Sequence, residues 1–101
     1  MRNNHVELKG TLTRDIELSK STKGNSFVKF SIACLRDGKD KRLDYINCIA
    51  FGQTADELDQ VGTQDTPLEI VGNLRISSYE KDGKKNYSTS VVVESFEVSD
   101  N

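Results

Sequence analysis

The chain of 101 residues has few of the residues that build metal centres or disulfide frameworks, with two cysteines and a single histidine. Two cysteines and one histidine cannot supply the four ligands of a structural zinc site, and no metal or cofactor is expected. Cys34 and Cys48 lie among apolar residues on separate predicted strands, so we interpret both as buried free thiols. His5 has neither a nucleophile nor a second metal ligand close by, and we expect it at the surface or in an interface.

Long apolar runs are missing as well. No stretch reaches the roughly 18 apolar residues of a membrane span, and residues 1–5 do not begin a secretory signal. Hydrophobic residues make up 35% of the chain and charged residues 30%, which is typical of soluble proteins. We therefore expect one domain over residues 1–98, with residues 99–101 as a short polar end, in the cytoplasm and without membrane association.

The chain also lacks an excess of positive charge, since its formal net charge is −2. The charges are nevertheless segregated, with nine basic and four acidic residues in 9–42, and five acidic but no basic residues in 53–70. Such a chain can present a basic face to phosphates while its other side stays acidic. There is no nucleophile–base pair and no phosphate-cradling glycine loop, so we do not expect an enzyme. The carboxylates of Asp56, Glu57 and Asp59 fit a solvated helix face.

Alternation of apolar and polar residues predicts most of the secondary structure. Five strands are expected, at residues 4–12, 27–35, 43–52, 68–76 and 87–98. The first four place their even positions inward, and in the fourth strand these inward positions include Leu74 and Ile76. Segments 13–26, 36–42, 63–67 and 80–86 are expected to be loops, 36–42 and 80–86 being flexible charged hairpin loops.

A short amphipathic helix is expected over residues 53–61. Ala55, Leu58 and Val61 recur at three-residue spacing, Thr54 is a candidate N-terminal cap, and Gly62 follows the last position. Five strands with one short helix between the third and the fourth is the order of the OB-fold, an all-β five-stranded Greek-key barrel. Gly10 and Gly72 are candidates for its tight corners. An open β-meander with a covering helix is the alternative, and the position of the helix favours the barrel.

The strand at residues 43–52 has two different faces. Its even positions are apolar, whereas the odd face carries Tyr45 and Phe51 on either side of Asn47 and Ile49. Two rings beside an amide can form a platform on which flat nucleobases stack. Aromatic residues are also common in strands for packing, so the alternative is that both rings pack beneath a loop or a subunit.

Four segments, at residues 6–18, 45–52, 68–74 and 87–93, resemble the bacterial-type single-stranded DNA-binding proteins, in the right order over nearly the whole chain. The resemblance implies base-stacking positions at Tyr45, Phe51 and Tyr79. The family often has a further aromatic, commonly tryptophan, after the second strand. This chain has Leu-Arg-Asp at 35–37 and no tryptophan, so that stacking site is lost or is replaced by the cation of Arg36.

The resemblance also indicates how the phosphates would be bound. The candidate nucleic-acid-binding residues are the three aromatics with Asn47 beside them, Lys29, Arg75 and the basic residues of the two charged hairpins, which are Arg36, Lys39, Lys41, Arg42, Lys84 and Lys85. The expected function is sequence-tolerant binding of single-stranded DNA, which protects it in replication, recombination or repair. One alternative is an OB-fold assembly module of a replication-restart or conjugation complex, and another is an RNA-binding domain, because stacking does not distinguish the sugar.

Partners follow from the same resemblance, which implies a homotetramer. The exposed-edge character of the first strand would suit pairing with a second copy. Family members that recruit replication enzymes carry a long linker with an acidic tip, whereas this chain reads Val-Ser-Asp-Asn at 98–101. We therefore expect either a truncated chain or a short form of the kind that phages and mobile elements encode, without recruitment of partners through a tail.

Overall fold

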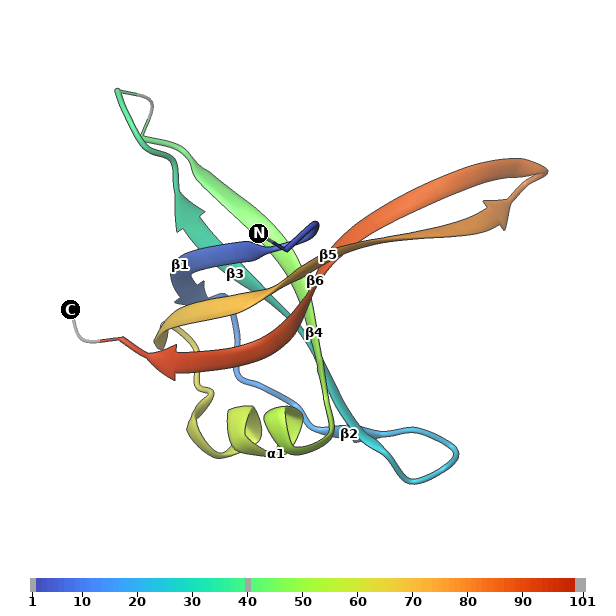
Figure 1. Cartoon of the computed structure of the whole chain (residues 1–101), viewed down its shortest axis with the longest axis horizontal. Coiled ribbons are helices and arrows are strands. Elements are labelled where there is room, and N and C mark those ends of the chain that lie inside the picture. Colours follow the sequence, from blue (N-terminus) through green and yellow to red (C-terminus); the bar gives the residue numbers. More distant parts are fainter. Residues whose placement is uncertain (1, 40, 100–101) are drawn as a thin grey trace.

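The computed structural model describes residues 2–39 and 41–99, and almost all of its regular structure belongs to one strongly bent sheet (Figure 1). The described elements are β1 Val6–Leu12, β2 Ser19–Lys20, β3 Ser26–Leu35, β4 Leu43–Phe51, α1 Gly52–Val61, β5 Pro67–Lys81 and β6 Lys84–Val98. No helix within these residues is long and apolar enough to cross a membrane.

The sheet closes on itself to form a barrel. Its strand order is β1-β5-β6-β4-β3-β2, and β1 also returns to pair with β3. The pairings are antiparallel except between β4 and β6, which run parallel. Five strands in a closed ring, with the only described helix between the third and the fourth of them, form an OB-fold. The predicted barrel is confirmed, and the two-residue strand β2 extends its edge beside β3.

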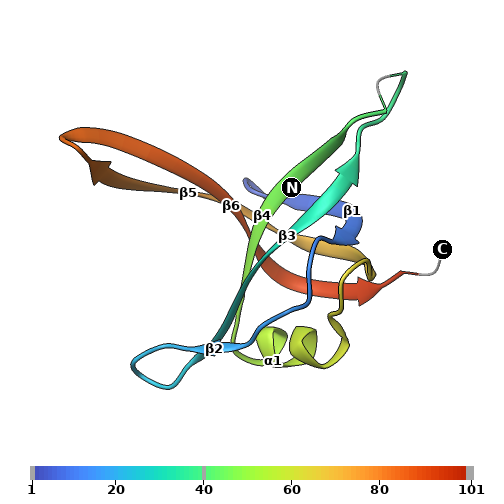
Figure 2. The ribbon, with the colours of Figure 1, turned by 180° about the vertical axis from the view of Figure 1, so that it is seen from behind.

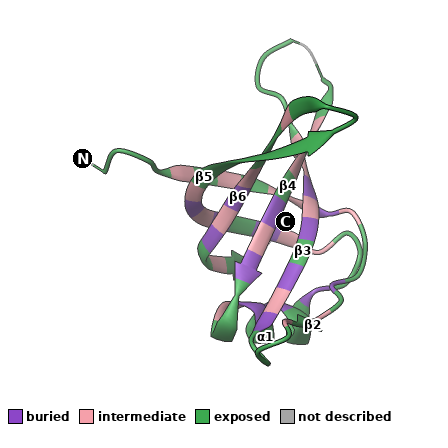
Figure 3. Ribbon diagram, turned by 90° about the vertical axis from the view of Figure 1, so that its right-hand side faces the viewer, coloured by how far each residue is buried: buried purple, intermediate pink, exposed green. Residues whose placement is uncertain are grey.

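The inside of the barrel is built from the predicted even positions of β1, β3, β4 and β5, together with the odd positions Val91 and Val93 of β6. Fully or almost fully buried side chains come from all five barrel strands and from α1, and include Leu12, Ile32, Leu58, Leu68, Ile70 and Val91. Burial is concentrated on the barrel strands, whereas the hairpins are exposed (Figure 3). Burying side chains of this size contributes roughly 1.5–3 kcal/mol each, so the alternation of the strands is also what stabilises the barrel.

Helix α1 closes one end of the barrel through Ala55 and Leu58, both fully buried. Two predictions about this helix are wrong. Thr54 is not its cap, because the N-cap is Phe51 and makes no side-chain capping hydrogen bond, and Val61 is exposed. The predicted end at Gly62 is confirmed, and a Cβ there would collide with Cγ1 of Ile16.

Close backbone contacts explain the two glycines predicted at corners. A Cβ on Gly10 would lie 2.6 Å from the carbonyl oxygen of Ala33, and one on Gly72 would collide with that of Val92. The β5–β6 register shifts between Val71 and Gly72, so that Glu94 is the extra residue of a β-bulge. A bulge bends the strand that carries it and increases its twist, which lets β6 turn from the hairpin into the barrel.

The prediction of a flexible loop at residues 80–86 is wrong. β5 continues to Lys81 and β6 begins at Lys84, joined by Asp82 and Gly83 with φ of 53° and 76°. Two successive positive φ values are the signature of a tight hairpin turn whose twist matches that of the strands. The resulting hairpin projects away from the barrel in both views (Figures 1 and 2).

The projection of this hairpin also corrects the inward assignment of Leu74 and Ile76. Both are exposed, Ile76 at 64% of its surface, because the strand has left the barrel at these positions and has no core beneath it. In the segment at residues 13–26, where a loop with a terminal turn was expected, the structure adds the short β2 pairing of Ser19 with Phe27 and of Lys20 with Ser26.

A polar network ties the start of the chain to the base of this hairpin. Arg2 donates two hydrogen bonds to the Glu94 carboxylate, each of 2.7 Å, and Asn73 donates a third of 3.0 Å. The side chain of Asn4 pairs with the backbone N–H and C=O of Leu74 at 2.8 and 2.7 Å. The bonds from Arg2, followed by the bond from Asn73, lower the pKa of Glu94 to about 2.

Replacing Gly72 with alanine tests the bulge. The methyl group would collide with the Val92 carbonyl, so we expect the free energy of unfolding in urea to fall by about 1–3 kcal/mol. Ser95→Ala, at an exposed position of the neighbouring strand β6, should change it by less than about 0.5 kcal/mol. Equal stability of the two variants would show that the close approach does not constrain the fold.

The Glu94 network predicts a component of acid sensitivity. Because the pKa of Glu94 lies at about 2 in the folded chain and near 4.5 without its partners, protonation favours the unfolded chain. Its stabilising contribution is therefore complete above about pH 4.5 and is lost as the pH falls towards 2. Urea midpoints of wild type and Glu94→Gln should differ at pH 7 and converge at the acid end. A constant difference across this range would contradict the assignment.

Candidate nucleic-acid interface

The outward positions of β3 and β4 form one continuous surface. In the antiparallel register five outward residues of β3 stand opposite five of β4, which gives the pairs Phe27–Phe51, Lys29–Ile49, Ser31–Asn47, Ala33–Tyr45 and Leu35–Leu43. Directly opposed side chains have Cβ atoms about 4.5–5.5 Å apart, so each pair acts as one rung. We call these ten residues the outer strip.

The outer strip continues onto β6 and then onto β5. The parallel pairing aligns Ile49 with Val92, so the alternate residues Val92, Ser90 and Ser88 share the outward side of the sheet. Through the β5–β6 register, Arg75, Ser77 and Tyr79 stand opposite Ser90, Ser88 and Asn86. The exposed face of the projecting hairpin that carries Tyr79 is therefore an extension of the outer strip.

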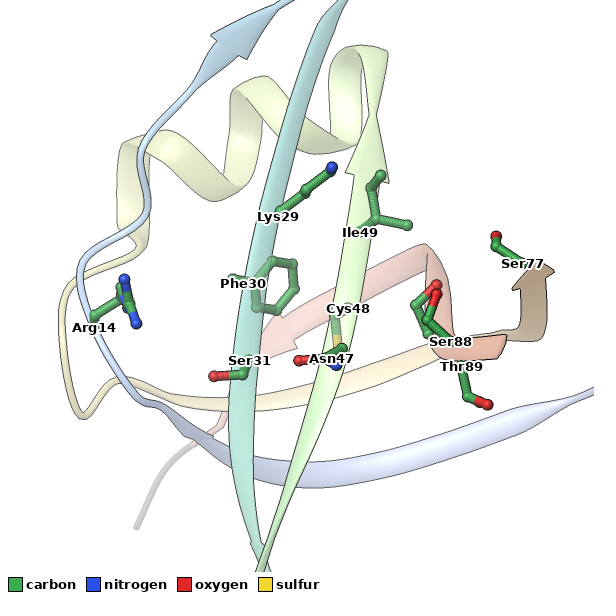
Figure 4. Close-up of a pocket in the computed structure, with 11 residues that line it drawn as sticks. Arg14, Lys29, Phe30, Ser31, Asn47, Cys48, Ile49, Ser77, Ser88 and Thr89 are labelled. Carbon is green, nitrogen blue, oxygen red and sulfur yellow. The ribbon is translucent and has the colours of Figure 1, made fainter. Parts of the chain in front are cut away.

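A groove of about 580 Å³ lies where the outer strip meets the base of this hairpin. Its polar lining comes from four strands and comprises Ser31, Asn47, Ser77, Ser88, Thr89 and Ser90. Lys29 and Arg14 add two cations, Arg14 coming from the segment between β1 and β2 (Figure 4). Hydroxyl and amide groups both donate and accept hydrogen bonds, so this lining suits a partner with mixed polar edges and negative charge.

Two exposed rings lie on the outer strip beyond the groove. Tyr45 is 67% exposed and Phe51 is 51% exposed, and they lie six residues apart on β4 with Asn47 and Ile49 between them. At about 3.4 Å per residue the two positions are roughly 20 Å apart. The structure thus brings Lys29, Tyr45, Asn47 and Phe51 onto one face, as expected, and no described part of the chain covers the two rings.

The other predicted residues lie on the two hairpins. Tyr79, 51% exposed, Arg75 and Lys84 share the outward face of the β5–β6 hairpin by register. Lys85 does not join them, because it stands on the opposite face, where its Nζ lies 5.8 Å from the centre of the Tyr87 ring.

Arg36, Lys39, Lys41 and Arg42 are exposed in and beside the β3–β4 hairpin, and Asp40 of this hairpin lies outside the described residues. Arg36 bonds the Asp44 carboxylate through Nε at 3.0 and 3.1 Å and through Nη2 at 3.0 Å. These bonds lower the pKa of Asp44. Arg36 therefore shares its charge with a carboxylate.

Several residues of the groove were not predicted from the sequence. Arg14, Ser77, Ser88 and Thr89 line it. Ser77 lies between the predicted strand at 68–76 and the predicted loop at 80–86, and Ser88 and Thr89 belong to the predicted strand at 87–98, for which the pattern gave no inward face. For Arg14 the signal was its place in the basic first half of the chain. Tyr87, 65% exposed, lies on the opposite face of the hairpin from Tyr79 by register.

The described titratable groups include no cluster of three or more His, Cys, Asp or Glu side chains that could hold a metal ion. Both thiols are free, Cys48 buried and Cys34 half-buried, so the prediction of full burial holds only for Cys48. Burial, with a smaller contribution from Cys34, raises the pKa of Cys48 to about 12. Burial also raises the pKa of Cys34, so both sulfurs are protonated at neutral pH.

Comparison with known proteins gives a consistent result over nearly the whole chain. The model of the single-strand binding protein family matches residues 3–99. The single-stranded DNA-binding protein of Clostridium perfringens is 42% identical over 99 residues, covering 96% of this chain and 66% of that protein. The protein of the same name from Fusobacterium nucleatum is 37% identical over 100 residues, covering 93% of this chain and 65% of that protein.

Single-stranded DNA-binding protein 2 of Streptococcus agalactiae is 33% identical over 99 residues, covering 94% of this chain and 76% of that protein. The chain thus spans just under two thirds of the length of the first two relatives.

Proposed function

The chain belongs to the single-strand binding protein family, and on that premise we propose that it binds single-stranded DNA, with little preference for sequence, along the outer strip. The observation that carries the proposal is the pair of exposed rings, Tyr45 and Phe51, on the same face as a polar groove with two cations. The relatives named above are bacterial single-stranded DNA-binding proteins. The protein would act in the cytoplasm, where DNA becomes single-stranded during replication, recombination or repair.

Stacking supplies the part of the affinity that depends on unpaired bases. An exposed ring on a rigid strand presents a flat apolar surface to any of the four bases, and each stacked base contributes about 1–3 kcal/mol by alanine substitution. Tyr45, Phe51 and Tyr79 supply three such surfaces, two on the barrel and one on the hairpin. Duplex DNA keeps its bases in the helix and cannot use them.

Electrostatics supplies the part that depends on the phosphates. Lys29 and Arg14 line the groove, Arg75 and Lys84 lie on the outward face of the β5–β6 hairpin, and the β3–β4 hairpin adds Lys39 and Lys41. Each phosphate that a cation neutralises releases condensed counterions, so affinity falls as salt rises. The acidic residues Asp56, Glu57 and Asp59 are all exposed on α1, at the end of the barrel.

One OB-fold covers only about 4–16 nucleotides, so tight coverage requires several copies. β1 pairs with β3 only at Thr11 and Leu12, and on that side no described strand pairs with residues 6–10. Unpaired backbone groups along a strand edge favour pairing with another strand. We therefore include in the proposal a homotetramer with closed symmetry, in which the β1 edge of one copy pairs with the β1 edge of another.

Alanine at both Tyr45 and Phe51 tests the stacking mechanism. Two lost stacks at about 1–3 kcal/mol each should weaken oligo-dT binding at least about 30-fold. Fluorescence anisotropy should be measured at two salt concentrations with dT, duplex and RNA of equal length. Tyr87→Ala removes a ring of similar exposure from the opposite face of the hairpin and serves as the matched control, with an effect below about threefold.

The outcomes of this titration separate the candidate functions. Tighter binding of duplex than of dT would contradict the proposal, and salt-independent binding would remove its electrostatic half. Tighter binding of RNA would favour the RNA-binding alternative. If the Tyr45→Ala, Phe51→Ala variant keeps its DNA binding but dissociates in sedimentation, the alternative in which the rings lie in a protein interface is favoured.

The oligomeric state has its own test. Sedimentation equilibrium of wild type at micromolar concentration should give the mass of four chains, about four times the 11.3 kDa of one chain. The Tyr45→Ala, Phe51→Ala variant should give the same mass, because neither ring lies on the β1 edge. A wild-type monomer would remove the tetramer from the proposal, and a variant that dissociates would place the rings in a subunit interface.

A further inference from the structure

A second phenylalanine lies beside Phe51 at the α1 end of the outer strip. Phe27 stands directly opposite Phe51 in the β3–β4 register, so both rings belong to the same rung. The neighbours of Phe27 along β3, Ser26 and Val28, are buried, whereas Phe27 keeps part of its surface exposed. Its side chain therefore lies on the outward side of the sheet and not in the core.

We propose that Phe27 and Phe51 together form a two-ring platform that holds one base of the bound strand, which makes Phe27 a fourth aromatic contact for DNA. This inference rests on the proposed function. Directly opposed rings have Cβ atoms about 4.5–5.5 Å apart and prefer offset or edge-to-face geometries with centroids 4.5–7 Å apart. A pair of this kind spans both strands and offers a base more apolar surface than Phe51 alone.

The surroundings of Phe27 favour contact with DNA over packing beneath other parts of the chain. On its other side Phe27 pairs with Ser19 of β2, a small residue that is itself exposed and cannot cover a ring. Lys29 follows on the same face, about 7 Å along the strand, and lines the groove. Lys20 is exposed on the edge strand β2, but it stands opposite the buried Ser26, so by register it belongs to the other face of the sheet.

The consequence is a longer binding path than the groove alone provides. A strand lying in the groove would pass Lys29 and place a base on the Phe27–Phe51 rung. The β2–β3 edge then belongs to the DNA-binding surface. Tyr45 at the other end of the outer strip has only Ala33 opposite it, so the two ends of the strip differ in the aromatic surface that they offer.

The test combines a variant of the protein with a variant of the DNA. Phe27→Leu keeps an apolar side chain of similar size but removes the flat ring, and we expect it to weaken oligo-dT binding about 5- to 10-fold. Phe27→Tyr keeps the ring and should bind within about twofold of wild type. Each protein is titrated with oligo-dT that carries a single abasic residue at each position in turn.

A base that stacks on Phe27 creates a coupling that packing alone does not produce. In wild type an abasic residue should weaken binding at the position above the platform. In Phe27→Leu the loss at that one position should shrink, whereas the losses at other positions remain. If Phe27→Leu weakens every oligonucleotide by the same factor, or none, while wild type binds dT, the inference is overturned and the proposed function stands.

A second measurement on the wild-type protein needs no substitution. Oligonucleotides with 5-iodouracil in place of single thymines are bound and irradiated, and the cross-linked peptides are identified by mass spectrometry. Cross-links to Phe27 as well as to Phe51 support the platform. Cross-links to Phe51, Tyr45 or Tyr79 without any to Phe27 overturn it. This result does not depend on whether Phe27→Leu folds, because only the wild-type protein is used.

Discussion

Two residue pairs between β1 and β3 close the barrel, and the outer strip that we propose binds single-stranded DNA depends on that closure. Thr11 pairs with Ala33 and Leu12 with Ile32, and the two strands can approach because Gly10 has no side chain where the Ala33 carbonyl lies. Over these residues neither β1 nor β3 has a free edge, and the closed barrel determines which side chains point inward. Because the side chains of a strand alternate, the same register that buries Ile32 turns Ser31 and Ala33 outward.

The outward positions then acquire a function that the inward ones cannot have. Several large apolar side chains that are not needed for the core are exposed on the outer strip, and contiguous exposed apolar surface with a polar surround is typical of binding sites. Tyr45 and Phe51 lie on this face beside a polar groove. The projecting β5–β6 hairpin extends the face beyond the barrel, whereas the acidic residues of α1 lie at the barrel end. The barrel strand β4 therefore holds the rings of Tyr45 and Phe51 in place. The hairpins lengthen the surface and add positive charge.

The barrel itself could be predicted from the sequence, because one face of each barrel strand is buried and the other is not. The prediction failed where that contrast ends. From Leu74 onward both faces of β5 are exposed, so Leu74 and Ile76 continue the pattern without a core beneath them. The charges at residues 80–86 suggested a loop, although Asp82 and Gly83 form a tight turn. Tyr79 was predicted only through the family resemblance. Phe27 was correctly placed outward, but its pairing with Phe51 depends on the register, which alternation alone does not determine.

The most direct test of the central claim uses the small number of aromatic residues, three tyrosines and four phenylalanines. Aromatic ¹³C–¹H spectra of the selectively labelled protein, with and without oligo-dT, report each ring separately. Our account predicts that ring currents of stacked bases shift the signals of Tyr45, Phe51 and Tyr79, while those of Phe96, which packs against the core, stay in place. Binding that leaves Tyr45 and Phe51 unshifted, or that shifts only Phe96 and Tyr87, would contradict it.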